Sequence, residues 1–163
     1  CNVFVDNDGE AYFVSTTEEN TNIGLFRLAD DYLSAESHVC LMPGLRREAP
    51  VIVRHDNLYY MLSSACTGWA PNQCMLSVSK RLDRGWSQLE KIGDDKAFRT
   101  QAAAVIEIKG TKKTTYLYIG DRWMDPDLPS SKIIIFPIEF KDGKCIFEYR
   151  DEFRINFTTG EVE

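Results

Sequence analysis

The chain has 163 residues, enough for one domain of ordinary size, and 44% of them are apolar, which is the composition of a packed globular protein. Its formal net charge is −6 and its 19 Lys and Arg residues are scattered, whereas nucleic-acid backbones are bound by clustered basic side chains. No apolar run approaches the roughly 20 residues that a membrane-spanning helix needs. We therefore expect no nucleic-acid partner and no membrane association.

The residue types that hold metals show no suitable arrangement. The two histidines, His38 and His55, have no further ligand at metal spacing, and the five cysteines form neither a C-x-x-C pair nor a regular framework. Each cysteine lies in or beside an apolar run, so we expect buried thiols. We expect no metal site and no cofactor.

Short β-rich runs separated by turns fill the chain, and helical periodicity is nearly absent. The first hairpin is VFVDNDGEAYFVS, followed by IGLFRL and SHVCLM. The same order recurs from PVIVRHDNLYYMLSS, with QCMLSVSK and WSQLEKI, and again from AAAVIEIKGTKKTTYLYIGD, with KIIIFPIEF and KCIFEYRDEF. This pattern predicts an all-β chain of three four-stranded units, near residues 1–42, 47–93 and 99–150.

Four-stranded antiparallel units that repeat about every 40 to 55 residues are typical of the blades of a β-propeller. A β-sandwich is the alternative. Three blades fall short of the roughly four to eight that close a propeller ring. The chain also begins without Met and enters a strand pattern directly after Cys1. We therefore expect a partial propeller domain over residues 1–163 that packs against the remaining blades of a longer protein.

A propeller brings two sets of segments to the same end. The residues just before the first strand of each blade lie at one mouth of the central channel, and the loop between the second and third strands returns there. The first set is RREAP and FRTQ, and the second is STTEENTN, SACTGWAPNQ and GDRWMDPDLPSS. These segments are rich in Glu, Asn, Thr, Trp and Asp. We expect the functional site at this mouth.

Trp69 and Trp123 occupy equivalent loops of neighbouring blades. Flat aromatic faces surrounded by amides and carboxylates suit sugar rings, which offer apolar C–H faces and hydroxyl rims. The alternative is that both tryptophans pack between the blades. The pair predicts an oligo- or polysaccharide ligand.

Glycoside hydrolysis needs two carboxyl-type groups across the scissile bond, one of which is a protonated donor. Glu48, directly before a Pro and an apolar strand, is the candidate donor, and its alternative role is an ion pair with Arg46 or Arg47. The equivalent position one blade later is Gln101, which is not a carboxylate. The other acids expected at this mouth are Glu18, Glu19, Asp121 and Asp125.

Several motifs together resemble glycoside hydrolase family 43, most closely its exo-β-1,3-galactanase branch. They are REAP before a strand, CTGWAPN, TQ before the third unit, GDRW, and the closing DEFRIN and TTGE. The resemblance runs nearly end to end. It implies a five-bladed propeller and an inverting, exo-acting hydrolase of plant-type polysaccharide, with β-1,3-galactan favoured.

In that family a base, a carboxylate that tunes the acid, and a general acid come from three successive blades. Glu48 matches the general acid, and Gln101 matches a Gln that holds or activates the attacking water in this branch. The tuning Asp would precede Cys1, outside this sequence. Asn20 and Thr67 match sugar-contacting positions. The full set expected to bind substrate is Asn20, Thr67, Trp69, Asn72, Asp121 and Trp123.

Two departures from the family pattern affect the expected substrate. The strand after GDRW reads IIIFP where the family often has YVWLP, and Leu45 stands where Gly is often found. The alternatives are therefore an arabinofuranosidase or xylosidase of the same family, or a carbohydrate-binding propeller without catalysis. A polysaccharide substrate favours an extracellular or periplasmic location.

Overall fold

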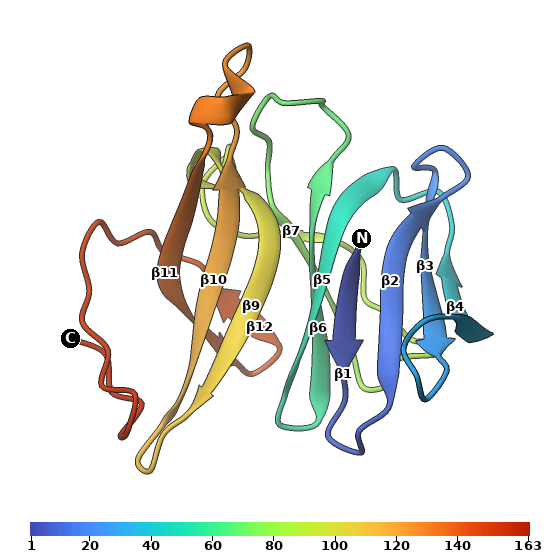
Figure 1. Cartoon of the computed structure of the whole chain (residues 1–163), viewed down its shortest axis with the longest axis horizontal. Coiled ribbons are helices and arrows are strands. Elements are labelled where there is room, and N and C mark those ends of the chain that lie inside the picture. The colour runs from blue at the N-terminus through green and yellow to red at the C-terminus, as the bar shows by residue number, and fades with distance from the viewer.

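The structure, a computed structural model, describes all 163 residues of the chain. Figure 1 shows three antiparallel sheets side by side, each with four strands hydrogen-bonded in chain order. The predicted all-β class and the three four-stranded units are confirmed, and we call these sheets the first, second and third blades. The two helices are short 3-10 turns, η1 (Ala97–Arg99) and η2 (Leu128–Ser130), and neither is long enough to cross a membrane.

The strand bounds follow the predicted repeat. The first blade consists of β1 (Asn2–Val5), β2 (Ala11–Thr17), β3 (Asn22–Leu28) and β4 (Ala35–Met42). The second consists of β5 (Arg47–His55), β6 (Leu58–Ala65), β7 (Met75–Ser79) and β8 (Glu90–Lys91). The third consists of β9 (Gln101–Lys109), β10 (Thr114–Arg122), β11 (Lys132–Lys141) and β12 (Lys144–Ile146).

The outer strands of the second and third blades are shorter than predicted. Next to β7, part of the backbone pairing expected for the outer strand is replaced by a side-chain hydrogen bond. The Ser87 hydroxyl accepts this bond from the Val78 amide at 3.0 Å. After β12 the chain leaves the sheet edge, and Phe147 turns into the core instead of continuing the strand. Local side-chain bonds and aromatic packing thus override the strand pattern at both edges.

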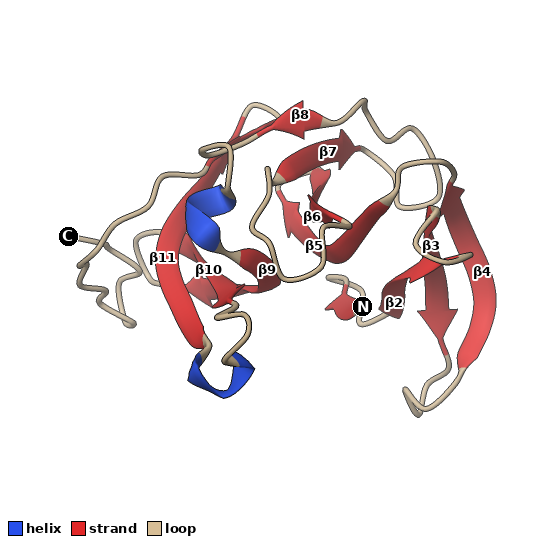
Figure 2. Cartoon of the chain, turned by 90° about the horizontal axis from the view of Figure 1, so that it is seen from above, coloured by secondary structure: helices blue, strands red, loops and turns tan.

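Seen from above, the blades form an arc, with the first strands on its inner side and the outer strands β4 and β8 on its outer side (Figure 2). The side-chain amide of Asn2 in β1 donates to the carbonyl oxygen of Ala103 in β9 at 2.7 Å. This bond joins the first blade directly to the third. The inner strands therefore lie close together around the axis of the arc.

Two apolar cores lie between the blades. The larger fills the seam between the second and third blades and includes Tyr60, Tyr118, Phe136 and Phe140. Its rings are in direct contact, and the Tyr118 and Phe136 centroids lie 4.9 Å apart. The smaller core, around Leu25 and its neighbours, joins the first blade to the second. Since each fully buried apolar side chain contributes about 1.5–3 kcal/mol, these face-to-face contacts hold the blades together.

The outward faces of the first and third blades are apolar and open. Val3 and Val5 of β1 are 54% and 56% exposed, and Ile133 and Ile135 of β11 are 67% and 44% exposed. In each strand the two residues are separated by one position, so they share one face of the sheet. Exposed apolar patches of this kind mark surfaces that pack against other protein.

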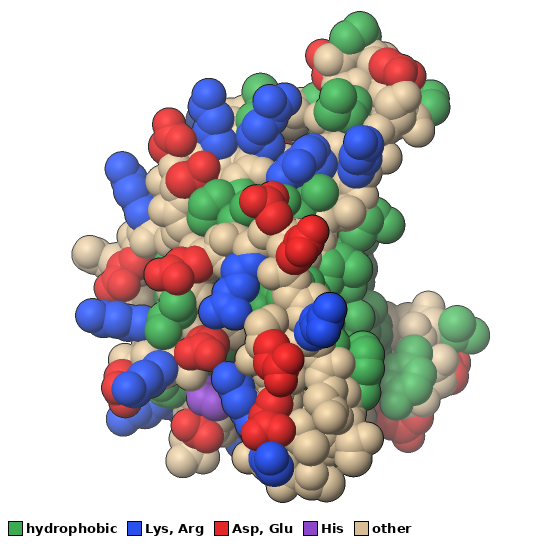
Figure 3. Space-filling model, turned by 90° about the vertical axis from the view of Figure 1, so that its left-hand side faces the viewer, with side chains coloured by type: hydrophobic (Ala, Val, Ile, Leu, Met, Phe, Trp, Pro, Cys, Tyr) green, Lys and Arg blue, Asp and Glu red, His purple; other side chains and the backbone are tan.

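The C-terminal residues 147–163 fold back along the third blade. The amide of Thr111, in the β9–β10 turn, donates to the Thr158 carbonyl at 2.8 Å, and the Thr115 hydroxyl donates to the Gly160 carbonyl at 2.5 Å. Figure 3 shows this side of the molecule as a mixture of basic, acidic and apolar side chains. The terminal segment is thus docked on the blade by hydrogen bonds from both the backbone and side chains.

The cysteines differ in part from the expectation. All five are free thiols, and Cys40 and Cys74 are buried, as predicted. Cys1 and Cys66 are exposed, because one begins the chain and the other follows β6 in a surface loop. For these two, the prediction of a buried thiol is wrong.

Candidate active site

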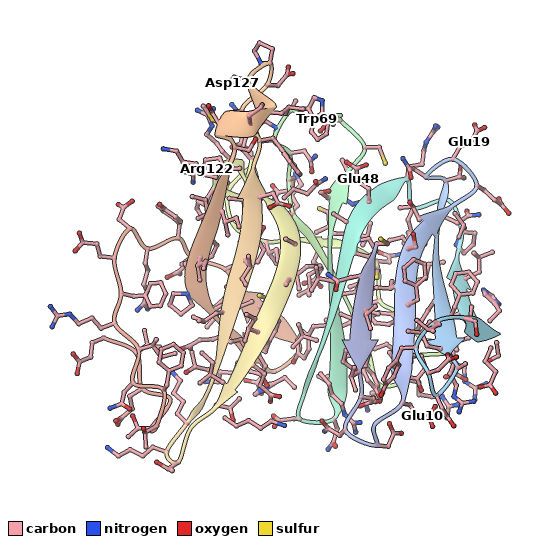
Figure 4. All side chains as sticks on the ribbon, viewed as in Figure 1. Glu10, Glu19, Glu48, Trp69, Arg122 and Asp127 are labelled. Carbon is pink, nitrogen blue, oxygen red and sulfur yellow. The ribbon has the colours of Figure 1, made fainter.

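Glu48 lies within β5 and not ahead of it, because the strand already begins at Arg47. The pairing with β6 is interrupted by a bulge between Glu48 and Val51, where Ala49 has a φ of 49°. A bulge turns a side chain away from its regular direction. Figure 4 shows Glu48 at the upper end of the blades, the end that also carries Trp69.

The Glu48 carboxylate is held by an amide from the next blade. Gln101, the first residue of β9, donates from Nε2 to Glu48 Oε1 at 3.0 Å and to the Ser64 hydroxyl at 2.9 Å. Its Oε1 accepts the indole N–H of Trp123 at 3.1 Å. The structure therefore brings Glu48, Gln101 and Trp123 together across the seam between the second and third blades.

Glu48 makes no ion pair with Arg46 or Arg47, so that alternative is not realised. Arg47 is buried on the other side of β5, where its guanidinium donates to the carbonyls of Ser63 at 2.5 Å and Gln73 at 2.9 Å. Burial lowers the pKa of Arg47. Its hydrogen bonds thus connect β6 to the end of the β6–β7 loop, just before β7.

The two tryptophans meet over the seam. Their ring centroids lie 5.0 Å apart with the planes inclined by 60°, so each ring covers part of the other. Trp69 is nonetheless 47% exposed, while Trp123 is half-buried. Of the two alternatives, Trp123 therefore packs between blades, and Trp69 offers an aromatic face at the mouth.

Thr67 and Asn72 stabilise their own loop. The Asn72 side chain accepts from the Ala65 amide at 2.7 Å, and its Nδ2 donates to the Ala65 carbonyl at 2.9 Å and to the Thr67 hydroxyl at 2.8 Å. The Thr67 hydroxyl donates in turn to the Ala70 carbonyl at 2.7 Å. Both hydrogens of the Asn72 amide are used. This network fixes the shape of the loop that carries Trp69.

Asp121 lies beside Gln101, its partner in the β9–β10 ladder. Its carboxyl group is half-buried, and burial raises its pKa above the usual value. It lines a narrow hollow under the β6–β7 loop together with both tryptophans and Gln101. The remaining lining residues are Gly68, Ala70, Pro71, Asn72, Arg99 and Thr100.

Asn20 lies apart from this group. It ends a tight turn in which Glu18, Glu19 and Asn20 have φ values of 49°, 53° and 63°, and its side chain is exposed. The Arg46 amide donates to the Thr21 carbonyl at 3.1 Å, which ties the turn to the segment before β5. Figure 4 shows Glu19 of this turn at the same end as Glu48. Asn20 is therefore on the rim of the mouth, without contact to Gln101.

Ser64 was not predicted from the sequence to belong to the site, and Arg47 was considered only as an ion-pair partner of Glu48. Ser64 pairs with Glu48 in the β5–β6 ladder, so a hairpin register counted from the turn between those strands could have found it. Arg47 carries no such signal, because only the bulge decides which of the neighbouring Arg47 and Glu48 side chains faces the mouth.

Three successive four-stranded antiparallel blades define the chain as part of a β-propeller. An acid, an amide and an aromatic pair lie together at one mouth of it. No protein-family model and no curated protein matches it. Among solved structures, an exo-β-1,3-galactanase from Clostridium thermocellum is 37% identical at a TM-score of 0.95, and the match covers 99% of this chain and 36% of that chain. An exo-β-1,3-galactanase from Phanerochaete chrysosporium, solved with β-1,3-galactotriose, is 29% identical at a TM-score of 0.90, with coverages of 98% and 37%. A family 43 β-1,3-galactosidase with galactodeoxynojirimycin is 32% identical at a TM-score of 0.83, with coverages of 93% and 45%.

The resemblance to glycoside hydrolase family 43 that the sequence motifs predicted is confirmed, because the chain is similar over nearly its whole length to solved proteins of this kind. It spans between 36% and 45% of the length of these three solved proteins. The three blades therefore correspond to only part of each of these solved proteins.

Proposed function

We propose that this chain forms part of the catalytic propeller of an inverting, exo-acting glycoside hydrolase that acts on β-1,3-linked galactan outside the cytoplasm. The observation that carries the proposal is the Glu48 carboxylate, bonded to Gln101 across the seam beside an exposed Trp69. The galactotriose and galactodeoxynojirimycin bound to the solved relatives support a galactose-containing substrate.

In this proposal Glu48, once protonated, donates its proton to the glycosidic oxygen as the bond to the leaving sugar breaks. Positive charge then develops on the sugar ring, water attacks the opposite face, and the proton that this water loses passes to solvent. Trp69 stacks on the sugar and orients it. Gln101 orients the attacking water through its amide, since an amide can both donate and accept hydrogen bonds.

The contact between Glu48 and Gln101 sets a condition on this mechanism. Their atoms are 3.0 Å apart, whereas an inverting site needs roughly 6.5 to 9.5 Å between the groups that flank the sugar and the water. An entering sugar therefore has to break this hydrogen bond. Glu48 is then free to reach the glycosidic oxygen, and Gln101 is free to receive a water.

The test uses the full-length protein with β-1,3-galactan and NMR detection of the first product. Exo-acting inversion predicts single galactose units released first as the α-anomer. A first product in the β-anomer, or internal cleavage, contradicts the proposed mechanism. Release of arabinose or xylose from aryl glycosides supports the related specificities instead, and sugar binding without release supports a binding module.

A further inference from the structure

The amide of Gln101 has a defined orientation, and its neighbours impose it. A tryptophan N–H can only donate a hydrogen bond, so the group that faces it has to be an acceptor. Trp123 therefore has to face the amide oxygen, and Glu48 has to face the amide nitrogen, as the distances of 3.1 Å and 3.0 Å show. A flipped amide would set the N–H of Trp123 against the NH2 group of Gln101, donor against donor.

Ser64 supports the same orientation from the second blade. Its hydroxyl is directed to the Glu48 carbonyl at 3.4 Å, which leaves a lone pair to accept from Gln101 Nε2 at 2.9 Å. Ser64 is only 5% exposed, so water competes little for this bond. Two fixed groups, Trp123 and Ser64, thus hold the amide at its two ends.

These two contacts persist when the bond to Glu48 is broken. The amide nitrogen then has one free hydrogen, and the amide oxygen keeps one free lone pair beside the Trp123 bond. Both free positions belong to a group whose rotation is still blocked by Trp123 and Ser64. That is the arrangement needed to hold a single water in one orientation.

We infer that Trp123 and Ser64 are positioning residues, which fix the amide of Gln101 so that it can orient the attacking water. This inference rests on the proposed function. It assigns Trp123 a role different from that of Trp69, although the rings touch. Trp123 is half-buried and its N–H is engaged, whereas Trp69 is exposed and its N–H has no partner within the chain.

A kinetic test compares the same substitution at both rings in the full-length protein. Trp123→Phe keeps an aromatic ring but removes the N–H donor, so kcat should fall by roughly tenfold while KM changes little. Trp69→Phe reduces the aromatic area that stacks on the sugar, so this variant should mainly raise KM. Ser64→Ala should resemble Trp123→Phe, and Ser64→Thr, which restores the hydroxyl, should recover much of the kcat. A Trp123→Phe protein whose loss lies in KM alone would show a sugar platform and overturn the inference.

A second measurement does not depend on activity. The protein has three tryptophans in this chain, and their indole N–H groups differ: Trp86 donates to the Leu82 carbonyl at 3.1 Å, Trp123 donates to Gln101, and Trp69 is free. Hydrogen exchange of these signals, followed by NMR, should be slow for Trp86 and Trp123. Gln101→Ala should accelerate exchange at Trp123 and leave Trp86 unchanged as the internal control. Unchanged exchange at Trp123 would overturn the inference even if hydrolysis is observed, and a protein without hydrolytic activity can still be tested this way.

Discussion

At the scale of single residues, Glu48 carries the most direct prediction. Glu48→Gln keeps the size of the side chain but removes the transferable proton. On a β-1,3-linked galactan, whose leaving group needs protonation, the rate should fall by roughly 10² to 10⁴. Binding of galactotriose, measured by calorimetry, should persist.

The leaving group separates proton donation from positioning. An aryl galactoside with an acidic phenol as leaving group needs no proton from the enzyme, so Glu48→Gln should slow it much less than galactan. Equal losses on both substrates would reject the role of general acid. Full activity on both substrates would show that the hydrogen bond between Gln101 and Glu48 only stabilises the contact between the second and third blades.

The sequence predicted the positions of the residues at the mouth better than their hydrogen bonds. Glu48, Gln101 and the two tryptophans were found because residue type and position in the repeat suffice to place them at one end. The lack of an ion pair at Glu48 could not be predicted, because a single bulged residue, Ala49, decides the direction of its neighbours. The expected contact between Asn20 and the sugar stays a prediction, because the structure shows only that Asn20 is exposed on the rim.

At the scale of elements, β1 is connected to the β5–β6 hairpin by a buried polar contact. Asp6, directly after β1, accepts a hydrogen bond from the Tyr59 hydroxyl at 2.7 Å and an ion pair from Arg54. Burial alone would raise the pKa of Asp6, but the hydrogen bonds from Tyr59 and Arg54 outweigh it and hold this pKa below its usual value. Asp6→Asn should lower the free energy of unfolding by about 2 kcal/mol at neutral pH.

The pH dependence of this effect has a definite sign. A carboxylate with a lowered pKa stabilises the folded state above its unfolded pKa, and that contribution is lost as the pH falls through the folded pKa. The difference between wild type and Asp6→Asn should therefore be constant near neutrality and shrink below about pH 4. Urea denaturation at several pH values measures it, and Glu19→Gln, which changes an exposed carboxylate without a hydrogen bond or ion pair within the chain, serves as the control. A difference that grows at low pH would contradict the assignment.

The docking of the C-terminal segment depends on two glycines that nearly touch. A Cβ on Gly160, which has a φ of 76°, would lie 1.9 Å from the Lys113 carbonyl oxygen, and one on Gly110 would lie 2.1 Å from the Thr159 backbone. Gly160→Ala should therefore release residues 154–163 from the β9–β10 turn. Faster hydrogen exchange at the Thr111 amide would report this release.

A matched control separates the clash from backbone strain. Gly143 also has a φ of 76°, but a Cβ there meets nothing within 4 Å. Gly143→Ala thus carries only the cost of the left-handed backbone conformation. If both variants release the terminal segment equally, the close approach at Gly160 is not what holds it.

At the scale of the whole molecule, the open faces of the first and third blades govern association. The 163-residue chain expressed alone should self-associate through these faces, because their isoleucines and valines are exposed. Ile133→Lys with Ile135→Lys should reduce the association seen by sedimentation velocity. Leu33→Lys should not, although Leu33 is 86% exposed, because it lies in the turn between β3 and β4. A monomer at high concentration would contradict this expectation.

The repeat made the overall architecture predictable. Three hairpins of the same pattern, each followed by two strands, indicate blades without knowledge of any contact. The short outer strands β8 and β12 were less predictable, because they depend on the hydrogen bonds between Ser87 and β7 and on the packing of Phe147 into the core. Edge strands have fewer partners, so local pattern determines them least.

The position of Glu48 and Gln101 on opposite sides of the seam has a consequence for heat inactivation. The site is assembled only while the second and third blades stay in register, and the core that keeps them so lies between the same two sheets. On slow heating, a small parting of these sheets would separate the acid from the amide before any strand melts. Activity should then decline at a lower temperature than the far-ultraviolet circular dichroism signal, and a saturating galactose analogue that contacts both blades should bring the two curves together.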